Sequence, residues 1–279
     1  MRRTLIDFFA DLARADGEFL TYDDGYRTWS YTYGDVARSA RRVAARLRQE
    51  GIGKGEHVAI WCENRPEWIW TLWGCLLEGV VLVPVDYRAS AEFLLKVSAI
   101  VRARAIVLGE TVTRDITTDI PLWSIRGLDG AAEATPDSAS AATPDDVAEI
   151  IFTSGATAEP KGVVITHRNI LANVNPIERE VAKYRKYARP FRPIRFLNLL
   201  PLSHMFGQAM ATFVPPMLPG TVVFTRSFAP EEIVRQIRRR RVSVLVCVPK
   251  ILEVLREHIV RTLPEASMEP PPGTHWVRR

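Results

Sequence analysis

The residues best suited to chemistry lie in one short segment, "EIIFTSGATAEPKGVVITHRN", which runs from Glu149 to Asn169. It passes from an apolar stretch through small and hydroxyl residues to Lys161, and a helical pattern follows. A loop between a strand and a helix can aim several backbone N–H groups at an anion, and Ser154 and Thr157 add hydroxyl donors. Together with the lysine ammonium, this predicts binding of phosphate oxygens. The alternative is a turn whose small residues serve its shape alone.

The common nucleotide phosphate loop, G-x-x-x-x-G-K-[ST], does not describe this segment. Gly155 and Lys161 stand at its first glycine and its lysine. Pro160, which has no N–H to donate, replaces the second glycine, and Gly162 replaces the hydroxyl residue that binds magnesium. This loop must therefore enclose phosphate groups in a different way from the common motif, which argues against a kinase or a GTPase.

The elements that must position this loop alternate along the chain between strand patterns and helix patterns. Strands are expected at residues 27–33, 57–62, 80–86, 104–109, 147–155, 195–202, 221–225 and 242–249. Helices are expected at residues 1–17, 32–51, 64–79, 90–103, 167–188, 204–217, 229–241 and 250–263. Thr32 and Asn64 are the expected caps of two of these helices, and Pro176 is expected to kink or break a third. The alternation predicts an α/β fold with largely parallel sheets flanked by helices.

Composition suggests how the chain is divided. Residues 127–146 are rich in Gly, Ala, Ser and Pro and are expected to form an exposed loop or linker. A first α/β subdomain is expected at residues 1–126, and a second α/β segment with the phosphate loop at residues 147–263. The Pro-rich residues 264–279 are expected to be an irregular tail.

Several function classes are disfavoured by composition. The longest apolar stretch, Trp68–Val85, is interrupted by Glu78 and Gly79 and is therefore expected to be a buried helix and strand, not a membrane span. The three cysteines are widely spaced, and no zinc-site or other metal-ligand spacing is present in the sequence. These features favour a reducing, cytoplasmic setting. The net charge of +5 permits an anionic partner without requiring one.

Two motifs carry a resemblance to a known family. The segment "FTSGATAEPKGV" resembles the signature loop of the AMP-binding, adenylate-forming enzymes, whose pattern is T-S-G-T-T-G-x-P-K-G-V, and "THRN" matches its usual continuation. The segment "LNLLPLSHMFGQ" is similar to the "LPLxHxxG" signature of the acyl-CoA synthetases in that family. The resemblance extends from Thr28 to about Leu263 and implies an incomplete large N-terminal domain of such an enzyme.

The resemblance implies a reaction and its cofactors. A substrate carboxylate, expected to be that of a fatty acid, attacks the α-phosphate of ATP, pyrophosphate leaves, and the thiol of coenzyme A then takes the acyl group. Magnesium assists, and no protein metal ligands are expected in this chain. His204 is expected near the carboxylate end of the acyl pocket. The residues implied to hold the ATP phosphates are Thr153, Ser154, Gly155, Thr157, Lys161 and Gly162.

Two features depart from the family pattern. Ala156 and Ala158 stand where the family usually has a hydroxyl residue and a glycine, so weaker phosphate binding is expected. The family's magnesium-binding glutamate, its ribose-binding aspartate and its mobile C-terminal domain have no match in this sequence. The chain is therefore expected to be an N-terminal portion that does not complete adenylation by itself.

An alternative function is a non-catalytic basic module. Residues Arg235–Arg241 form a dense basic run, and Lys183–Phe196 interleaves basic and aromatic residues. Such patterns suit contact with an anionic membrane surface or with nucleic acid. Of these two, peripheral membrane contact is favoured and a nucleic-acid partner is not expected. A serine hydrolase is disfavoured because Ser203 and His204 are merely adjacent and no G-x-S-x-G is present.

Overall fold

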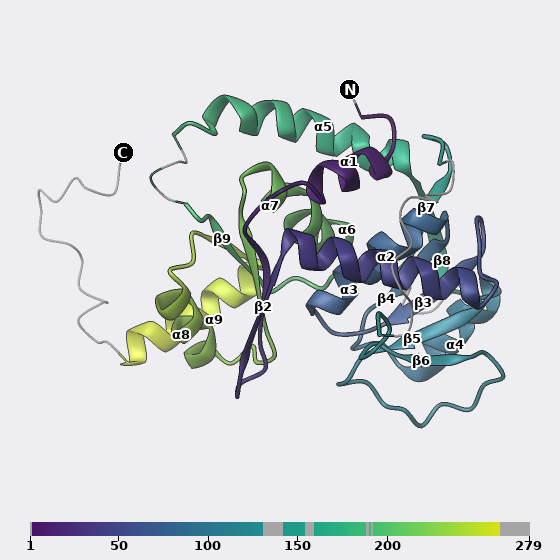
Figure 1. Cartoon of the computed structure of the whole chain (residues 1–279). Helices are drawn as coiled ribbons and strands as arrows, with labels where there is room; N and C mark the ends of the chain where they lie inside the picture. The colour runs from purple at the N-terminus through teal and green to yellow at the C-terminus, as the bar shows by residue number, and fades with distance from the viewer. Residues whose placement is uncertain (1, 131–141, 154–158, 188–189, 191, 263–279) are drawn as a thin grey trace, which may run out of the picture.

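A computed structural model describes residues 2–130, 142–153, 159–187, 190 and 192–262. Among them are two β-sheets, which we name sheet A and sheet B (Figure 1). Sheet A has five strands in the order β11-β9-β10-β1-β2, and sheet B has six in the order β6-β5-β3-β4-β7-β8. Sheet A contains β1 (Glu18–Asp23), β2 (Thr28–Thr32), β9 (Arg195–Asn198), β10 (Thr221–Thr225) and β11 (Val244–Val246). Sheet B contains β3 (His57–Trp61), β4 (Val81–Val85), β5 (Ala105–Leu108), β6 (Leu122–Ser124), β7 (Val147–Thr153) and β8 (Lys161–Thr166).

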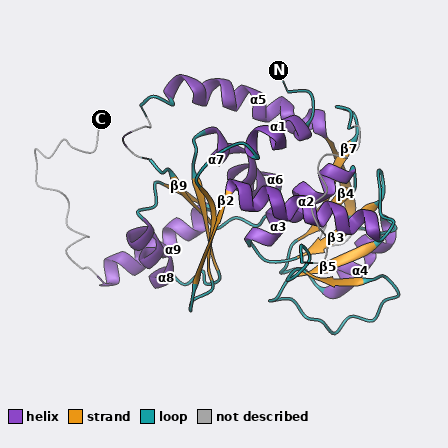
Figure 2. Cartoon of the chain, viewed as in Figure 1, coloured by secondary structure: helices purple, strands orange, loops and turns teal. Residues whose placement is uncertain are grey.

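Helices cover both sheets (Figure 2). In chain order the described helices are α1 (Leu5–Leu12), α2 (Tyr33–Gln49), α3 (Pro66–Glu78), α4 (Ala91–Ile100), α5 (His167–Tyr184), α6 (Met205–Gln208), the π-helical turn η2 (Ala209–Phe213), α7 (Val214–Met217), α8 (Pro230–Arg240) and α9 (Pro249–Thr262). Most strand pairs are parallel; the β1–β2 and β7–β8 pairs at the sheet edges are antiparallel. The predicted α/β fold with largely parallel sheets is confirmed.

The sheets do not follow the order of the sequence. Sheet A joins the early strands β1 and β2 to the late strands β9–β11, and sheet B adds β7 and β8 to β3–β6. Each sheet thus takes strands from both sides of the segment 127–146. The predicted tail, residues 264–279, lies outside the described residues.

The main hydrophobic core lies between the two sheets. It contains side chains of α1, α2, α3 and the helical run α6–η2–α7, and these helices lie between the sheets in Figure 1. At its centre, the ring of Trp73 stacks on Phe8 at 6.0 Å and meets the edge of Phe213 at 5.8 Å. A second core lies between sheet B and α4, and a third between sheet A and helices α8 and α9. The layers therefore run from α8 and α9 through sheet A, the central helices and sheet B to α4.

The apolar stretch Trp68–Val85 forms a helix and a strand, as predicted. Gly79 ends α3 with φ of 69°, a left-handed conformation that glycine adopts without steric cost. The chain then reverses into β4, whose side chains are all buried. Among the described residues no helix combines the length and the hydropathy needed to span a membrane.

The prediction that the phosphate loop leads directly from a strand into a helix was wrong. The loop after β7 leads into a strand, β8, which pairs antiparallel with β7, because Val163, Val164 and Ile165 form a β-branched run that favours extended backbone. The loop is therefore a hairpin connection, and α5 begins only at His167. Helix α5 also continues through Pro176 without a break. Pro176 and Ala172 are exposed, so water can bond the carbonyl that loses its intrahelical donor.

Candidate functional site

Two of the predicted site residues, Thr153 and His204, lie at or just after the carboxyl ends of strands. Asp86 follows β4, Thr153 ends β7, and His204 follows β9 by a short loop. Strands β4 and β7 are parallel neighbours in sheet B, and β9 belongs to sheet A. Ligands of α/β proteins characteristically bind beyond the carboxyl ends of the strands. The fold therefore brings both sequence motifs to one edge of the molecule.

The phosphate segment is the hairpin between β7 and β8. Thr153 lies opposite Lys161, and Phe152 lies opposite Gly162. Lys161 is exposed, and its side chain makes no hydrogen bond or ion pair with the described residues. The other predicted phosphate ligands, Ser154, Gly155 and Thr157, lie outside the described residues together with Ala156 and Ala158.

Close packing in this hairpin leaves no room for a side chain at Gly162. A Cβ atom at this position would lie 2.8 Å from Cγ2 of Ile150 and 2.9 Å from Cζ of Phe152. These distances are shorter than any ordinary carbon contact, so a side chain at residue 162 would displace its neighbours on β7. Its predicted role at the ATP phosphates stays a prediction.

His204 lies at the start of α6, opposite Asp86. Its imidazole is 59 % exposed, and Nε2 lies 3.5 Å from Oδ2 of Asp86. Burial raises the pKa of Asp86, but hydrogen bonds from Arg88 at 2.7 and 3.0 Å outweigh this effect and the pKa lies below its ordinary value. Asp86 is therefore an anion that faces the histidine at neutral pH.

A buried asparagine holds the loop that carries His204. Asn64 donates from Nδ2 to the carbonyl of Leu200 at 2.7 Å, and its Oδ1 accepts from the backbone N–H of Leu202 at 2.9 Å. The prediction that Asn64 caps α3 was wrong: the cap position belongs to Arg65, and the Asn64 side chain turns to the other sheet instead. A buried amide satisfies its donor and acceptor where partners exist, and here they lie in the loop after β9.

The glycine of the "LPLSHMFG" motif has a packing role. A Cβ atom on Gly207 would lie 2.2 Å from the carbonyl oxygen of Pro201, so the helix α6 can approach this loop only with glycine there. Asn198 secures the same contact by donating from Nδ2 to the carbonyl of Gly207 at 3.1 Å. The motif thus sets the direction of α6 and with it the position of His204.

An apolar pocket lies between the two motifs. It has a volume of about 390 Å³ and is bounded by strand β8, helix α5 and the helical run from Met205 to Val214. Small-molecule sites in proteins typically have volumes of roughly 300–1,000 Å³. Its polar lining residues are Asn169 and Asn173. The pocket suits a ligand with an apolar body.

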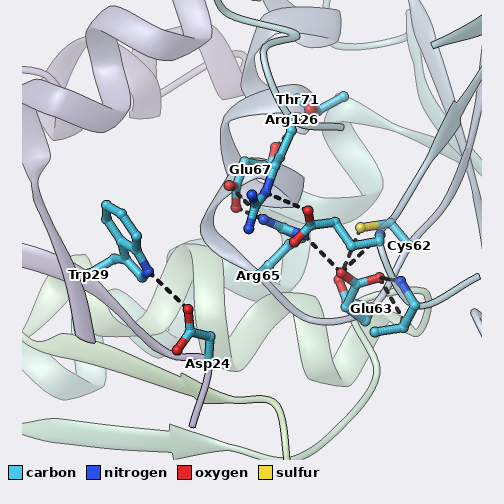
Figure 3. Close-up of polar contacts among 10 residues, drawn as sticks. Asp24, Trp29, Cys62, Glu63, Arg65, Glu67, Thr71 and Arg126 are labelled. Carbon is cyan, nitrogen blue, oxygen red and sulfur yellow. Dashed lines mark hydrogen bonds and ion pairs between the residues drawn. The ribbon is translucent and has the colours of Figure 1, made fainter. Parts of the chain in front are cut away.

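A buried ionic cluster supports the same edge of sheet B (Figure 3). Arg65, only 2 % exposed, donates to both carboxylate oxygens of Glu67 at 2.8 and 2.9 Å and to Glu63 and Glu110 at 2.9 and 2.8 Å. Burial opposes the charge of Arg65, but these carboxylates outweigh it and raise its pKa. The cluster joins the ends of β3 and β5 and gives the edge a rigid base.

Sequence reasoning did not identify Asp86 or Arg65 as members of the site. A signal for Asp86 was present, because a polar residue directly after a buried parallel strand lies at the ligand-binding edge of a sheet. For Arg65 the sequence showed the nearby carboxylates Glu63 and Glu67 but not the third partner, Glu110, which is distant in the sequence.

The basic run on α8 is partly neutralised within the chain. Arg235 pairs with Glu232, and Arg240 lies 3.7 Å from Asp23. Arginines held in this way are less available to a membrane or to nucleic acid. The structure thus gives the basic-module alternative less support than the ligand site at the strand ends.

Comparison with known proteins identifies a family whose model matches this chain. The model of the family described as "AMP-binding enzyme" matches residues 10–271. The chain is 28 % identical to a feruloyl-CoA synthase from Amycolatopsis sp over 233 residues, which cover 81 % of this chain and 45 % of that protein. It is 26 % identical over 275 residues to a crotonobetaine/carnitine–CoA ligase from Shigella dysenteriae, with 91 % and 52 % covered. The chain thus spans about half the length of these curated relatives.

Solved structures with the same fold include the O-succinylbenzoate coenzyme A synthetase of Bacillus subtilis in complex with AMP. That structure superposes with a TM-score of 0.74 at 23 % identity and covers 90 % of this chain and 64 % of its own. At this level of identity the likeness shows the arrangement of the two sheets and their helices, which agrees with the fold described above.

Proposed function

Because this chain belongs to the AMP-binding enzyme family, we propose that it serves in the ATP-dependent activation of a carboxylic acid. The acid carboxylate attacks the α-phosphate of ATP, pyrophosphate leaves with the electron pair of the broken P–O bond, and an acyl-adenylate forms. The thiol of coenzyme A then displaces AMP to give the thioester. A cytoplasmic location, and contact with a membrane surface, stay predictions.

One observation carries this proposal. Val163 and Ile165 of the hairpin strand and Met205, which follows His204, line the same apolar pocket. Side chains alternate along a strand, so Lys161 lies on the face of β8 that carries Val163 and Ile165. The strand that begins at Lys161 and the residue that follows His204 thus line one cavity, and this supports a reaction between a carboxylate and ATP there.

Each of these residues has a physical task in the proposed reaction. The Lys161 ammonium neutralises phosphate charge, which increases in importance as pyrophosphate departs. His204 contacts the carboxylate end of the acid, and Asp86 keeps the imidazole in place. The pocket removes the apolar body of the acid from water and so orients it for attack. Within the described residues no group of three His, Cys, Asp or Glu side chains could hold a metal ion.

We propose an apolar acid, and specifically a fatty acid, as the substrate. The support is the lining of the pocket, in which the valines, isoleucines and Phe213 outnumber the two asparagines. The names of the relatives refer to acids of different chemistry, ferulate and crotonobetaine among them, so the acid must be identified by experiment.

ATP binding tests the phosphate site. We expect Lys161→Ala to weaken ATP binding by at least about tenfold in isothermal titration calorimetry, because a charge-assisted contact contributes roughly 1.5–3 kcal/mol. Lys250→Ala, which removes an exposed lysine of α9 paired with Glu253, is the matched control and is expected to bind ATP as the original chain does. Equal affinity of the two variants would contradict the proposal.

Acid binding tests the pocket. Ala209→Phe places a ring in the cavity and is expected to abolish binding of a fatty-acid series, whereas Ala99→Phe on the exposed face of α4 is expected to leave it unchanged. If Ala209→Phe still binds the acids, the acid does not bind in this pocket and the assignment is wrong. Pyrophosphate release with ATP and the bound acid then measures the reaction itself; the prediction that this chain alone does not complete adenylation is tested by the same assay.

A further inference from the structure

A carboxyl group is buried in sheet B behind the proposed site. Glu149 lies on β7, the strand that ends at Thr153, and its side chain is fully buried. Its strand neighbours are Leu82 of β4 and Ile165 of β8, both apolar. A buried carboxyl group in such surroundings is costly unless it is hydrogen-bonded or neutral.

The partner of Glu149 is Gln208, at the end of α6. Its Nε2 donates to Oε2 of Glu149 at 2.8 Å, and both side chains are fully buried. The other two oxygens of the pair, Oε1 of Glu149 and Oε1 of Gln208, find no hydrogen-bond partner among the described residues. Both are acceptors when the carboxyl group is ionised, so the ionised pair leaves two buried oxygens unsatisfied.

A single proton on the carboxyl group would give both of these oxygens a hydrogen bond. A hydrogen on Oε1 of Glu149 can be donated to Oε1 of Gln208, so that acid and amide are joined by two hydrogen bonds. The surroundings favour that form: burial raises the pKa of Glu149 to about 7, and the hydrogen bond from Gln208 lowers it only in part. None of the neighbours packed on it supplies a charge, since β4 and the segment 205–213 have no titratable side chain and β8 has only Lys161, at its far end.

We propose that Glu149 and Gln208 form a neutral acid–amide pair, closed by one proton, that fastens the strand of the phosphate hairpin to the helix of His204. The backbone N–H of Gln208 donates to the carbonyl of His204 at 3.0 Å. Gln208 therefore lies one helical turn after the histidine and is linked to it by a backbone hydrogen bond. Glu149 is thus a positioning residue, and loss of its proton loosens α6 and η2 from sheet B. This inference rests on the geometry of the pair and holds whether or not the proposed reaction is correct.

Infrared spectroscopy tests the protonation state directly. The carbonyl stretching band of a protonated carboxylic acid is expected in the unaltered chain at pH 6, to disappear with a midpoint near pH 7, and to be absent from Glu149→Gln at pH 6 and above, where ordinary carboxyl groups are ionised. Glu159→Gln, an exposed glutamate beside the same hairpin, is the control and is expected to keep the band. A chain without the band at pH 6 has an ionised Glu149, and the proposal is then wrong.

Amide hydrogen exchange tests the fastening. Above pH 7, after correction for the intrinsic rate, exchange in residues 205–213 is expected to rise about tenfold in the unaltered chain, the factor for loss of one hydrogen bond of ordinary strength. Glu149→Gln is expected to abolish the rise, because its amide donates to Gln208 at every pH. Burial lowers the pKa of His57 and of His167, and a change of pH can also alter their charge, so the Glu149→Gln variant and not pH alone is the reference.

Two further results decide the matter. Gln208→Met, which removes both hydrogen bonds and keeps the length of the side chain, is expected to show the fast exchange at pH 6 as well. Equal, pH-independent exchange in the unaltered chain and Glu149→Gln would overturn the proposal. The infrared result on the unaltered chain remains decisive even where a variant fails to fold.

Discussion

The imidazole Nε2 of His204 lies 3.5 Å from Oδ2 of Asp86, and this contact joins the loop after β9 in sheet A to the end of β4 in sheet B. The carboxyl ends of strands from the two sheets therefore lie close together at Asp86. Asn64 makes a second link of the same kind through Leu200 and Leu202. The position of the histidine depends on contacts between the sheets and less on its own strand.

Asp86→Asn tests the charge at this junction. The folded pKa of Asp86 lies below its ordinary value, so its carboxylate stabilises the fold above the unfolded pKa and this contribution is lost as the pH falls through the folded pKa. We expect a loss of about 1–3 kcal/mol in the free energy of unfolding at pH 7 and a smaller difference at pH 3, measured by urea unfolding. Asp145→Asn, at an exposed ion pair, is the control. A difference that stays constant with pH would contradict this account.

Asn64→Ala tests the link between the sheets. It leaves the Leu200 carbonyl and the Leu202 N–H without their partner, and both are buried. Each unsatisfied group costs roughly 1–3 kcal/mol, so we expect a total loss of about 2–5 kcal/mol in chemical denaturation. Asn173→Ala, on the exposed side of α5, should stay within about 0.5 kcal/mol. If both variants lose the same amount, Asn64 is not a structural link.

Arg65→Met tests the buried ionic cluster. It leaves Glu63 and Glu67 without their cation and Glu110 with Arg126 alone, and breaking such a buried pair typically costs about 3–5 kcal/mol. The loss in the free energy of unfolding is expected to become smaller as the pH is lowered, because protonation removes the repulsion between the carboxylates. Arg104→Met, which removes the exposed ion pair with Glu56, should cost less than about 1 kcal/mol. Equal losses at pH 7 and pH 4.5 would show that packing, not charge, accounts for the effect.

Gly207→Ala tests the close approach of α6 to the preceding loop. The added Cβ would lie 2.2 Å from the Pro201 carbonyl oxygen, which is backbone and cannot move aside alone. We expect a loss of about 2 kcal/mol or more in thermal or urea unfolding, at the upper end of overpacking costs. Gly53→Ala meets no atom within 4 Å and should be neutral or slightly stabilising. A stable Gly207→Ala would mean that the loop adapts easily.

Much of the fold could be predicted because the local signals were strong. Thr32 caps α2 as expected, with its side chain accepting from the Asp35 N–H, and the apolar spacing of that helix matches its buried face. The segments 57–62, 80–86 and 104–109 each have a continuous apolar centre, and they form the parallel strands in the middle of sheet B. The periodicity of apolar residues is a property of the sequence alone, so these elements required no knowledge of their neighbours.

The candidate site was only partly predictable. The motifs named Lys161 and His204, but not the hairpin: the β-branched run of β8 was a signal for a strand, but it leads directly into the cap of α5 and was passed over in favour of that helix. Asn64 was assigned to the nearest helix, since its real partners lie far along the chain, at Leu200 and Leu202. The partners of buried polar groups are chosen by proximity in space, and sequence distance does not reveal them.

The amino-acid sequence by itself determined the class of fold, the motifs and the residue types available for chemistry. The tertiary structure decided which of them meet: Asp86 with His204, and Glu149 with Gln208. Each meeting joins a strand of sheet B to the segment after β9, and the sheets exchange strands from both halves of the chain. Local propensity acts over a few residues, whereas these contacts arise from burial of a shared core between the sheets, which only the whole fold creates.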